Sequence, residues 1–238
     1  MPILDAANKR ALVFDLDETL ADSLGQHERA FDLALQLNNR SLKELGEKNW
    51  LSCFGMRISD IVAFFYRHFE NMRMTEQEFL QERERIFMEL VEAGMNPMPG
   101  FASMMINLPK TRIRLALASS GTTSYVSLCL RKLGLSNSFE AVVTGDDVVH
   151  GKPHPEIYLL AAKRLGLAPR ECIAVEDSEH GVTSAKDAGM SCIAIHNPAL
   201  PLRFDLRRAD VELPDLAAIP ACLFSARTIS IDSRIKNK

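Results

Sequence analysis

The sequence predicts an α/β fold with a parallel sheet and a helical insertion. Five short runs rich in Val, Ile, Leu and Ala are near-continuously apolar, as strands buried on both faces of a parallel sheet are. Helical segments separate the later runs, which is typical of right-handed strand–helix–strand crossovers. A long interval after the first run contains no clear strand. The five strands are expected at Ala11–Asp15, Ile113–Ser119, Phe139–Thr144, Cys172–Asp177 and Ser191–His196.

Three helices are expected between the later strands. Residues 124–135, 155–167 and 178–190 place apolar side chains at helical spacing. Each segment runs into a glycine, and glycine just past the last turn is a common helix stop. The stops are Gly134, Gly166 and Gly189.

The interval without strands predicts a small inserted domain over residues 23–95. Its helices are expected at 24–37, 58–69 and 75–94. The chain is expected to return through Asn96–Gly100, because proline ends helices and fixes the backbone. Residues 1–22 and 96–238 then form the core. The tail after Pro220 receives no assignment.

The composition argues against a nucleic-acid-binding function. The 238 residues are 47% hydrophobic and 25% charged, with a formal net charge of −3, which fits one large domain or a core with an insertion. There is no basic surplus for a nucleic-acid backbone and no nucleic-acid-binding motif, so no nucleic-acid partner is expected.

The cysteines and the apolar runs favour a cytoplasmic protein. Neither a CxxC pair nor a metal-type Cys/His spacing occurs, so the thiols are expected to be reduced and mostly buried. The N-terminus has no apolar signal core, and no apolar run approaches the length of a membrane helix. The five cysteines are Cys53, Cys129, Cys172, Cys192 and Cys222.

Polar residues follow the predicted strands where an open α/β sheet has its functional crevice. Asp15 and Asp17 end the first strand, and Ser119, Ser120 and Gly121 end the second. Glu176 and Asp177 end the fourth strand, and Lys152 lies just before a helix.

These side chains together predict a site for Mg²⁺ and phosphate. Asp15 and Asp17 start on the same face of an extended backbone, and Asp177 would join them from a neighbouring strand. Three carboxylates can hold a hard divalent cation such as Mg²⁺, and a phosphate can complete the coordination of that cation. Lys152 and the Ser119 hydroxyl can donate hydrogen bonds to the phosphoryl oxygens. Singly, each group has a simpler interpretation: a turn, a helix cap or a surface lysine. Four such groups at strand ends, in this order, favour the site.

Four motifs together resemble the haloacid dehalogenase-like hydrolase superfamily. They are "DLDETL" at 15–20, "LALASS" at 115–120, "GKPHPEIY" at 151–158 and "VEDSEHGV" at 175–182. The sequence most resembles the branch of phosphoglycolate phosphatase and β-phosphoglucomutase. The resemblance implies a Rossmann-like three-layer α/β/α core with a parallel sheet, and it identifies the helical insertion with that family's cap.

The resemblance also implies the roles of the motif residues. Asp15 would be the nucleophile that becomes an aspartyl-phosphate, and Asp17 the general acid and base, oriented by Thr19. Ser119, Ser120 and Lys152 would bind the phosphoryl oxygens. Mg²⁺ would be held by Asp15, Asp177 and the backbone carbonyl of Asp17, with Glu176 bound directly or through water.

Four positions of the cap are weaker candidates for substrate contact. His27 matches a histidine of the related mutases near the acid/base aspartate. "CFGMRISD" at 53–60 resembles the specificity loop around Gly55. The mutases have an arginine where Ile58 stands here, and Arg57 precedes it. Arg83 could reach the site, although a solvated helix face with Glu–Arg pairs is the simpler interpretation.

The sequence therefore predicts a Mg²⁺-dependent phosphatase of a small phosphorylated metabolite, of the sugar phosphate or phosphoglycolate type, that acts through an aspartyl-phosphate intermediate. A β-phosphoglucomutase-like phosphosugar mutase is the alternative on the same scaffold. A receiver-type signalling module and an inactive binding protein are less favoured, because Asp17 and the cap are present and no motif residue is missing. The substrate and the oligomeric state are not assigned. Glu18 has no assigned role, and Asp22 is expected at the hinge into the cap.

Overall fold

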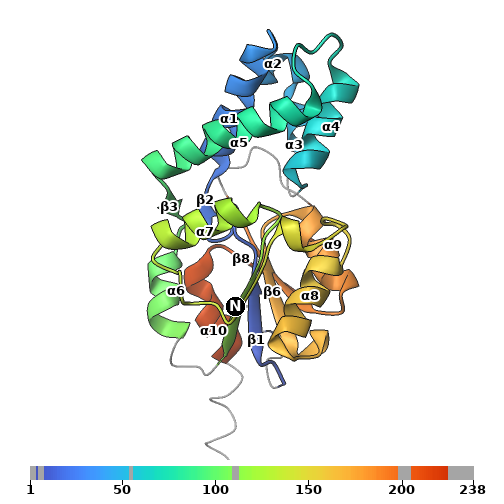
Figure 1. The fold of residues 1–238 in the computed structure, drawn as a ribbon. Helices are drawn as coiled ribbons and strands as arrows, with labels where there is room; N and C mark the ends of the chain where they lie inside the picture. The colour runs from blue at the N-terminus through green and yellow to red at the C-terminus, as the bar shows by residue number, and fades with distance from the viewer. Residues whose placement is uncertain (1–3, 5–7, 54–55, 109–112, 198–204, 225–238) are drawn as a thin grey trace, which may run out of the picture.

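The computed structural model describes residues 4, 8–53, 56–108, 113–197 and 205–224 and contains a six-stranded, fully parallel sheet (Figure 1). The strand order is β5-β4-β1-β6-β7-β8, which places β1 between two neighbours from later parts of the chain. The carboxyl ends of β4, β1 and β6 therefore meet at one edge, which confirms the predicted α/β class. The strands are β1 (Ala11–Phe14), β4 (Arg114–Ala118), β5 (Ala141–Val143), β6 (Cys172–Glu176), β7 (Ser191–Ile195) and β8 (Val211–Leu213).

The five predicted strands are present, and the sixth strand, β8, was not predicted. It has three residues, and the middle one, Glu212, is exposed. It pairs with β7 alone, at the edge of the sheet. So short a run with a charged centre gives no apolar signal in the sequence.

Alternating side chains bury both faces of the sheet, which makes the three layers. Leu12 and Phe14 of β1 pack with α6 (Phe101–Asn107), α7 (Thr123–Lys132) and α10 (Ile219–Phe224). The other face carries mostly small residues, and α8 (Glu156–Leu165) and α9 (Glu179–Asp187) cover it. Those small residues include Ala11, Ala116, Ala118, Ala174, Cys192 and Ala194.

The predicted helix stops are confirmed. Gly166 caps α8 with φ 64°, in the left-handed region that glycine adopts readily. Gly134 and Gly189 follow α7 and α9 with φ values of 71° and 82°. Short 3₁₀ turns lie at Gly145–Asp147, Pro169–Glu171 and Leu216–Ala218.

Within its described residues, the insertion contains helices joined by short loops and no strand, and it sits beyond the carboxyl ends of the strands of the large sheet (Figure 1). The three predicted helices correspond to α1, α4 and α5, and two short helices lie between α1 and α4. An aromatic core joins them, with the Phe31 ring centroid 5.3 Å from that of Phe65. The helices are α1 (Leu24–Leu37), α2 (Leu42–Leu45), α3 (Glu47–Leu51), α4 (Ile58–His68) and α5 (Glu76–Ala93).

The two connections to the insertion pair with each other. β2 (Ala21–Asp22) and β3 (Asn96–Pro97) form an antiparallel ladder in which Asp22 faces Asn96. Below it, the Met98 amide donates to the Leu20 carbonyl at 2.9 Å. The chain that enters the insertion is therefore paired with the chain that returns to the core. We call the paired residues 21–22 and 96–97 the linker ladder.

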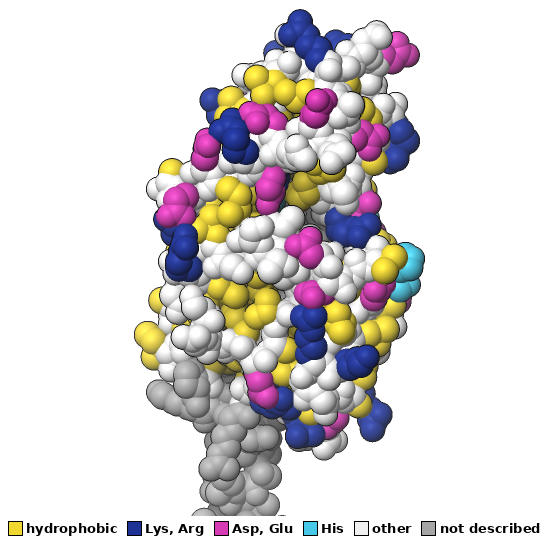
Figure 2. Space-filling view, viewed as in Figure 1, with side chains coloured by type: hydrophobic (Ala, Val, Ile, Leu, Met, Phe, Trp, Pro, Cys, Tyr) yellow, Lys and Arg dark blue, Asp and Glu magenta, His cyan; other side chains and the backbone are white. Residues whose placement is uncertain are grey.

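The exposed charges and the buried cysteines agree with what the composition of the sequence predicts. All five cysteines are buried and unpaired, as predicted. On the face shown in Figure 2, acidic and basic side chains are interspersed. Within the described residues, no helix is long and apolar enough to cross a membrane.

Gly100 should tolerate substitution worse than Gly166, although both have left-handed backbones. A Cβ at Gly100 would lie 2.4 Å from the Ala217 amide nitrogen, whereas a Cβ at Gly166 meets open space. Gly166→Ala should lose about 1–2 kcal/mol of unfolding free energy from the backbone strain alone. Gly100→Ala should lose at least about 1 kcal/mol more, because backbone atoms must shift. Urea denaturation of both variants tests this, and equal losses would contradict it.

Candidate active site

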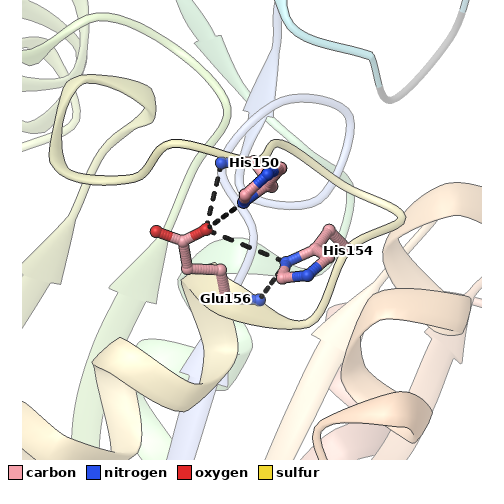
Figure 3. Close-up of side chains that lie close together, drawn as sticks. All are labelled: His150, His154 and Glu156. Atoms are coloured by element: carbon pink, nitrogen blue, oxygen red, sulfur yellow. Dashed lines mark hydrogen bonds and ion pairs between the residues drawn. The ribbon is translucent and has the colours of Figure 1, made fainter.

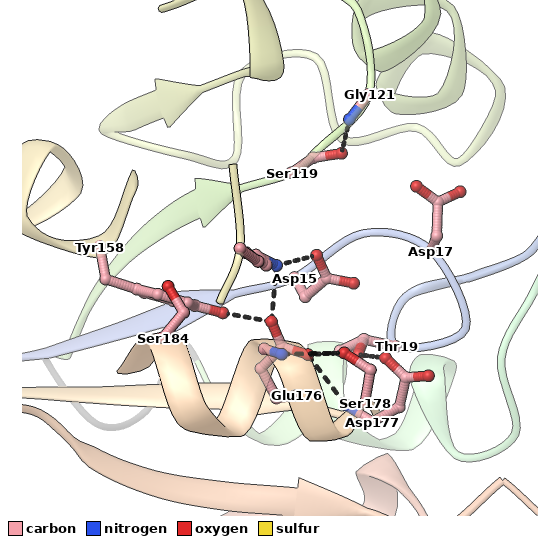
Figure 4. Close-up of polar contacts among 12 residues, drawn as sticks. Asp15, Asp17, Thr19, Ser119, Gly121, Tyr158, Glu176, Asp177, Ser178 and Ser184 are labelled. Atoms are coloured by element: carbon pink, nitrogen blue, oxygen red, sulfur yellow. Dashed lines mark hydrogen bonds and ion pairs between the residues drawn. The ribbon is translucent and has the colours of Figure 1, made fainter. Parts of the chain in front are cut away.

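The strand ends bring the predicted side chains together at the carboxyl edge of the sheet (Figure 4). Asp15 directly follows β1, and its amide donates to the Val175 carbonyl of β6 at 3.0 Å. Asp177 directly follows β6, the strand beside β1. Ser119 follows β4, the neighbour of β1 on the other side.

Lys152 lies between two buried carboxylates. Its Nζ donates to Asp15 Oδ1 at 2.6 Å and to Glu176 Oε1 at 2.5 Å. Burial alone would lower the pKa of Lys152, but the charges of Asp15 and Glu176 raise it above its usual value. The lysine is therefore a fixed positive charge beside Asp15.

Glu176 is fully buried, and its carboxylate has four protein partners. Oε1 accepts from Lys152 and from the Tyr158 hydroxyl at 2.6 Å. Oε2 accepts from the Ser178 hydroxyl and from the Asp177 amide, both at 3.2 Å. Gly181 of α9 makes room for this carboxylate, since a Cβ there would lie 2.0 Å from its oxygens.

Sequence reasoning missed Tyr158 and Gly181. Tyr158 occupies an apolar position of a predicted helix, where an aromatic residue is normally interpreted as part of the hydrophobic core. Gly181 offered a signal, because an isolated glycine inside a helical pattern often marks a close approach.

Three carboxylates share the centre of the site with the single ammonium of Lys152. Oxygens of Asp15, Glu176 and Asp177 all lie within 4.8 Å of one another. Burial raises the pKa of Asp15 to about 8 despite Lys152. Burial and the neighbouring Glu176 raise the pKa of Asp177 well above its usual range. A hard divalent cation fits this donor set, because it adds the missing positive charge to closely spaced oxygens.

Thr19 supports Asp177. Its hydroxyl donates to Asp177 Oδ1 at 3.1 Å, and its side chain is fully buried beneath the cleft. The expectation that Thr19 orients Asp17 is therefore wrong: the turn after β1 points the threonine toward β6.

Asp17 faces the helices of the insertion. Its Oδ1 accepts from the Ser23 hydroxyl at 2.6 Å, from His27 Nε2 at 3.2 Å and from the Tyr125 hydroxyl. Burial would raise the pKa of Asp17, but the hydrogen bonds from His27, Ser23 and Tyr125 outweigh it and lower the pKa.

The partners of His27 determine its tautomer. Arg83 has donors only, so its contact of 2.5 Å with His27 Nδ1 makes that nitrogen the acceptor. The ring proton then lies on Nε2 and points to Asp17. Burial lowers the pKa of His27, and the charge of Arg83 lowers it further, so the ring is neutral.

Arg83 is buried, which corrects the expectation of a solvated helix face. Its guanidinium carbon lies 4.5 Å from the Phe31 ring centroid and 4.2 Å from that of Phe87. Its Nε has no hydrogen-bond partner among the described residues. The exposed Glu–Arg pairing on this helix belongs to Arg85, two residues further along.

Arg57 lies where α4 meets the core. Its guanidinium donates to the Val149 carbonyl at 2.9 Å and to Asp60, and its side chain lies against Gly151. It is not among the residues that line the cleft above Asp15. Gly55 lies outside the described residues.

Ser119 and Ser120 differ in position. Ser120 lines the cleft, together with Gly121 and Thr122. Ser119 is fully buried, and its hydroxyl oxygen accepts from the Gly121 amide at 3.0 Å. That oxygen accepts one bond and keeps its own proton to donate.

Glu18 and Asp22 lie at the start of the insertion. Glu18 Oε1 accepts from the amides of Ser23 and Leu24 at 2.8 and 2.6 Å, and Oε2 accepts from the Asn197 side chain at 2.7 Å. Burial raises the pKa of Glu18 to about 7. The side chain thus fastens the first turn of α1 to the core. Asp22 lies in the linker ladder, at the crossing point.

A second cluster of possible metal ligands lies on the surface beside Lys152 (Figure 3). Glu156 accepts from the amides of Val149 and His150 and from His150 Nδ1, each at 3.0 Å. His154 accepts from the Glu156 amide at 3.3 Å. These contacts satisfy the carboxylate within the loop, so we interpret the cluster as fastening the loop that carries Lys152 to α8.

Tyr158→Phe should destabilise the protein by about 1–3 kcal/mol, because Glu176 loses a donor in a fully buried place. Tyr66→Phe is the matched control: its hydroxyl donates to the neutral Met74 carbonyl at 2.7 Å in a half-buried place. That control should lose only about 0.5–1.5 kcal/mol. Urea denaturation measures both, and a loss for Tyr158→Phe no larger than the control would contradict the assigned contact.

Comparison with known proteins gives one family. A model described as haloacid dehalogenase-like hydrolase matches residues 12–195. Hexitol phosphatase A of Escherichia coli is 33% identical over 88% of this chain and 93% of its own, and a phosphoglycolate phosphatase of Yersinia pestis is 33% identical over 78% and 80%. A β-phosphoglucomutase of Bacillus subtilis is 27% identical over 78% and 83%. The crystal structure of CbbY from Rhodobacter sphaeroides in complex with phosphate superposes with a TM-score of 0.79, at 26% identity over 90% of this chain and 99% of that one.

Proposed function

The chain belongs to the haloacid dehalogenase-like hydrolase family, and from that premise we propose that it is a Mg²⁺-dependent phosphatase of a small phosphorylated metabolite. The family membership confirms the resemblance predicted from the four motifs, and a phosphoglycolate phosphatase and a β-phosphoglucomutase are both among the matches. The observation that carries the proposal is the contact of Asp15 with Lys152 at the floor of a cleft that Asp17 also lines.

Asp15 is the proposed nucleophile. Its carboxylate oxygen attacks phosphorus, the bond to the substrate's ester oxygen breaks, and an aspartyl-phosphate forms. Lys152, Ser119 and Ser120 bind the phosphoryl oxygens. Bound Mg²⁺, held by Asp15, Asp177 and the Asp17 carbonyl, would supply the positive charge that lets a phosphate approach these carboxylates. Glu176 has four protein partners and is proposed to act on the cation through water.

Asp17 is the proposed acid and base. It gives its proton to the departing ester oxygen, and it then takes a proton from the water that hydrolyses the aspartyl-phosphate. The acid step needs a protonated Asp17, whereas its partners favour the anion. An incoming phosphate raises the pKa of a neighbouring carboxylate, because like charges repel.

The described helices between the linker strands support a cap over residues 23–95, with residues 1–22 and 96–238 as the catalytic core. The cap is proposed to exclude water from the cleft during the reaction. A cytoplasmic location stays a prediction.

The contact of His27 with Asp17 favours the mutase as a second candidate, because the related mutases carry a histidine at this position. Ile58, where those enzymes have an arginine, disfavours it. Incubation with glucose 1-phosphate and a hexose bisphosphate separates the two activities: a mutase moves the phosphoryl group between positions without net release of phosphate. Membership of the hydrolase family argues against the receiver-type module, and the complete set of motif residues argues against an inactive binding protein.

Asp15→Asn should lower phosphate release by about 10³-fold or more, because a neutral amide is a poor nucleophile. A panel of sugar, sugar-alcohol and two-carbon phosphates assayed with Mg²⁺ measures this. Asp187→Asn, which breaks a surface ion pair with Arg208, is the control and should keep full activity. Circular dichroism verifies that both variants fold. Retained turnover by Asp15→Asn would overturn the nucleophile assignment.

Removal of divalent metal should reduce phosphate release to background, and added Mg²⁺ should restore it. Mg²⁺ should also raise the melting temperature, because it binds the folded state and relieves the repulsion among Asp15, Glu176 and Asp177. Asp177→Asn should require at least about tenfold more Mg²⁺ for half-maximal activity. Full activity in EDTA would overturn the metal requirement.

A further inference from the structure

The loop that carries Lys152 presents a second set of possible metal ligands to solvent. His150 and His154 each lie two residues from Lys152, and Glu156 is the first residue of α8. The side chains of the two histidines are 64% and 51% exposed. None of the three ligands is among the residues that line the cleft, whereas Lys152 is. One short segment therefore serves the cleft with its lysine and faces solvent with these three side chains.

The two imidazoles approach the same oxygen of Glu156 (Figure 3). His150 Nδ1 lies 3.0 Å from Glu156 Oε2, and His154 Nδ1 lies 3.8 Å from it. One ligand atom from each of the three residues lies within 4.8 Å of the other two. Ligand atoms around a tetrahedral Zn²⁺ are about 3.3 Å apart, because the bonds to the metal are about 2.0–2.1 Å long. Small rotations of the exposed rings would therefore bring all three atoms to one cation.

The cluster has two acceptors that face each other. Glu156 is a carboxylate, because hydrogen bonds from the amides of Val149 and His150 and from the His150 ring lower its pKa to about 2. His154 Nδ1 accepts from the Glu156 amide at 3.3 Å, so this nitrogen carries a lone pair and the ring proton lies on Nε2. His154 Nδ1 and Glu156 Oε2 thus have no proton between them, which favours a cation at this place.

The contacts that fasten the loop leave room for a cation. The amides of Val149 and His150 use two of the four lone-pair positions of the Glu156 carboxylate. The proton on His150 Nδ1 can use a third. A cation takes the place of that proton when the neutral imidazole carries its single proton on Nε2 instead. Both amide contacts then stay as they are.

We propose that His150, His154 and Glu156 form a surface site for Zn²⁺, distinct from the carboxylate site in the cleft. Imidazole nitrogens with one carboxylate suit Zn²⁺, whereas Mg²⁺ prefers oxygen ligands. Three protein ligands leave a fourth position to water, which the exposure of the rings allows. The bound cation would join residues 150, 154 and 156 and so brace the loop from which Lys152 reaches Asp15.

Calorimetric titration with Zn²⁺ in excess Mg²⁺ tests the site. His150→Gln removes one ligand and keeps the amide contacts of Glu156, and it should weaken Zn²⁺ binding at least about tenfold. His68→Gln, at an exposed histidine of α4, is the control and should bind Zn²⁺ like the unaltered protein. Absence of binding to the unaltered protein, or equal affinity for His150→Gln, would overturn the inference.

Asp177→Asn separates the surface site from the cleft. Zn²⁺ on the two histidines should bind this variant as tightly as the unaltered protein, whereas Zn²⁺ on the cleft carboxylates should bind it more weakly. Weaker binding to Asp177→Asn with unchanged binding to His150→Gln would place the cation in the cleft, and the inference would fail. The outcome does not depend on the proposed phosphatase function, because the surface site uses no residue of the cleft.

A crystal soaked in Zn²⁺ gives the position of the cation directly. Anomalous scattering at the zinc edge should show a peak about 2.0–2.2 Å from a nitrogen of each histidine and from an oxygen of Glu156. The same soak of a His154→Gln crystal should reduce the peak. A peak that misses either histidine or Glu156 marks an adventitious ion only, and it would overturn the inference.

Discussion

The buried ammonium of Lys152, held between Asp15 and Glu176, is the contact on which the rest of the site depends. A buried charge is tolerated only where partners surround it, and a lone carboxylate in this place would be equally costly. The lysine loop must therefore reach the strands on which both acids sit. Glu156 fastens that loop to α8 from outside, and Tyr158 of the same helix supports Glu176 from inside.

The sheet makes this contact possible through the size of its side chains. The face toward α8 and α9 is lined mostly by alanines and other small residues, whereas the opposite face carries Leu and Phe. Small residues let two helices lie close to the sheet, so that Tyr158 and Gly181 both reach Glu176. The hydrogen bonds that stabilise the buried Glu176 thus depend on how closely α8 and α9 pack against the sheet.

The sequence predicted the parts of this protein that depend on local signals. Buried strands and glycine stops follow from apolar runs and backbone freedom, and the acids after β1 and β6 follow from their places at strand ends. β8 was missed because its three residues alternate around Glu212 and draw their stability from β7. Thr19 and Arg83 were misplaced because a side chain's direction is set by tertiary packing: Thr19 points to Asp177, and Arg83 lies between Phe31 and Phe87. No role could be predicted for Glu18, because Asn197, one of its hydrogen-bond partners, is far away in the sequence and reaches it only in the folded chain. Its contact with Ser23 depends on how the chain turns after β1.

The linker ladder has a consequence for proton transfer. The ladder holds the two connections to the insertion side by side, and a β-bridge between Asp17 and Ala21 places Asp17 next to it. Asp17 accepts hydrogen bonds from two residues of the N-cap and first turn of α1, Ser23 and His27, and from one residue of the core, Tyr125. Ser23 is held to the core through Glu18, so a displaced cap would remove chiefly the His27 donor, and Asp17 would then bind a proton more tightly. The position of the cap is therefore one of the factors that set how readily this carboxyl group gives up or takes a proton.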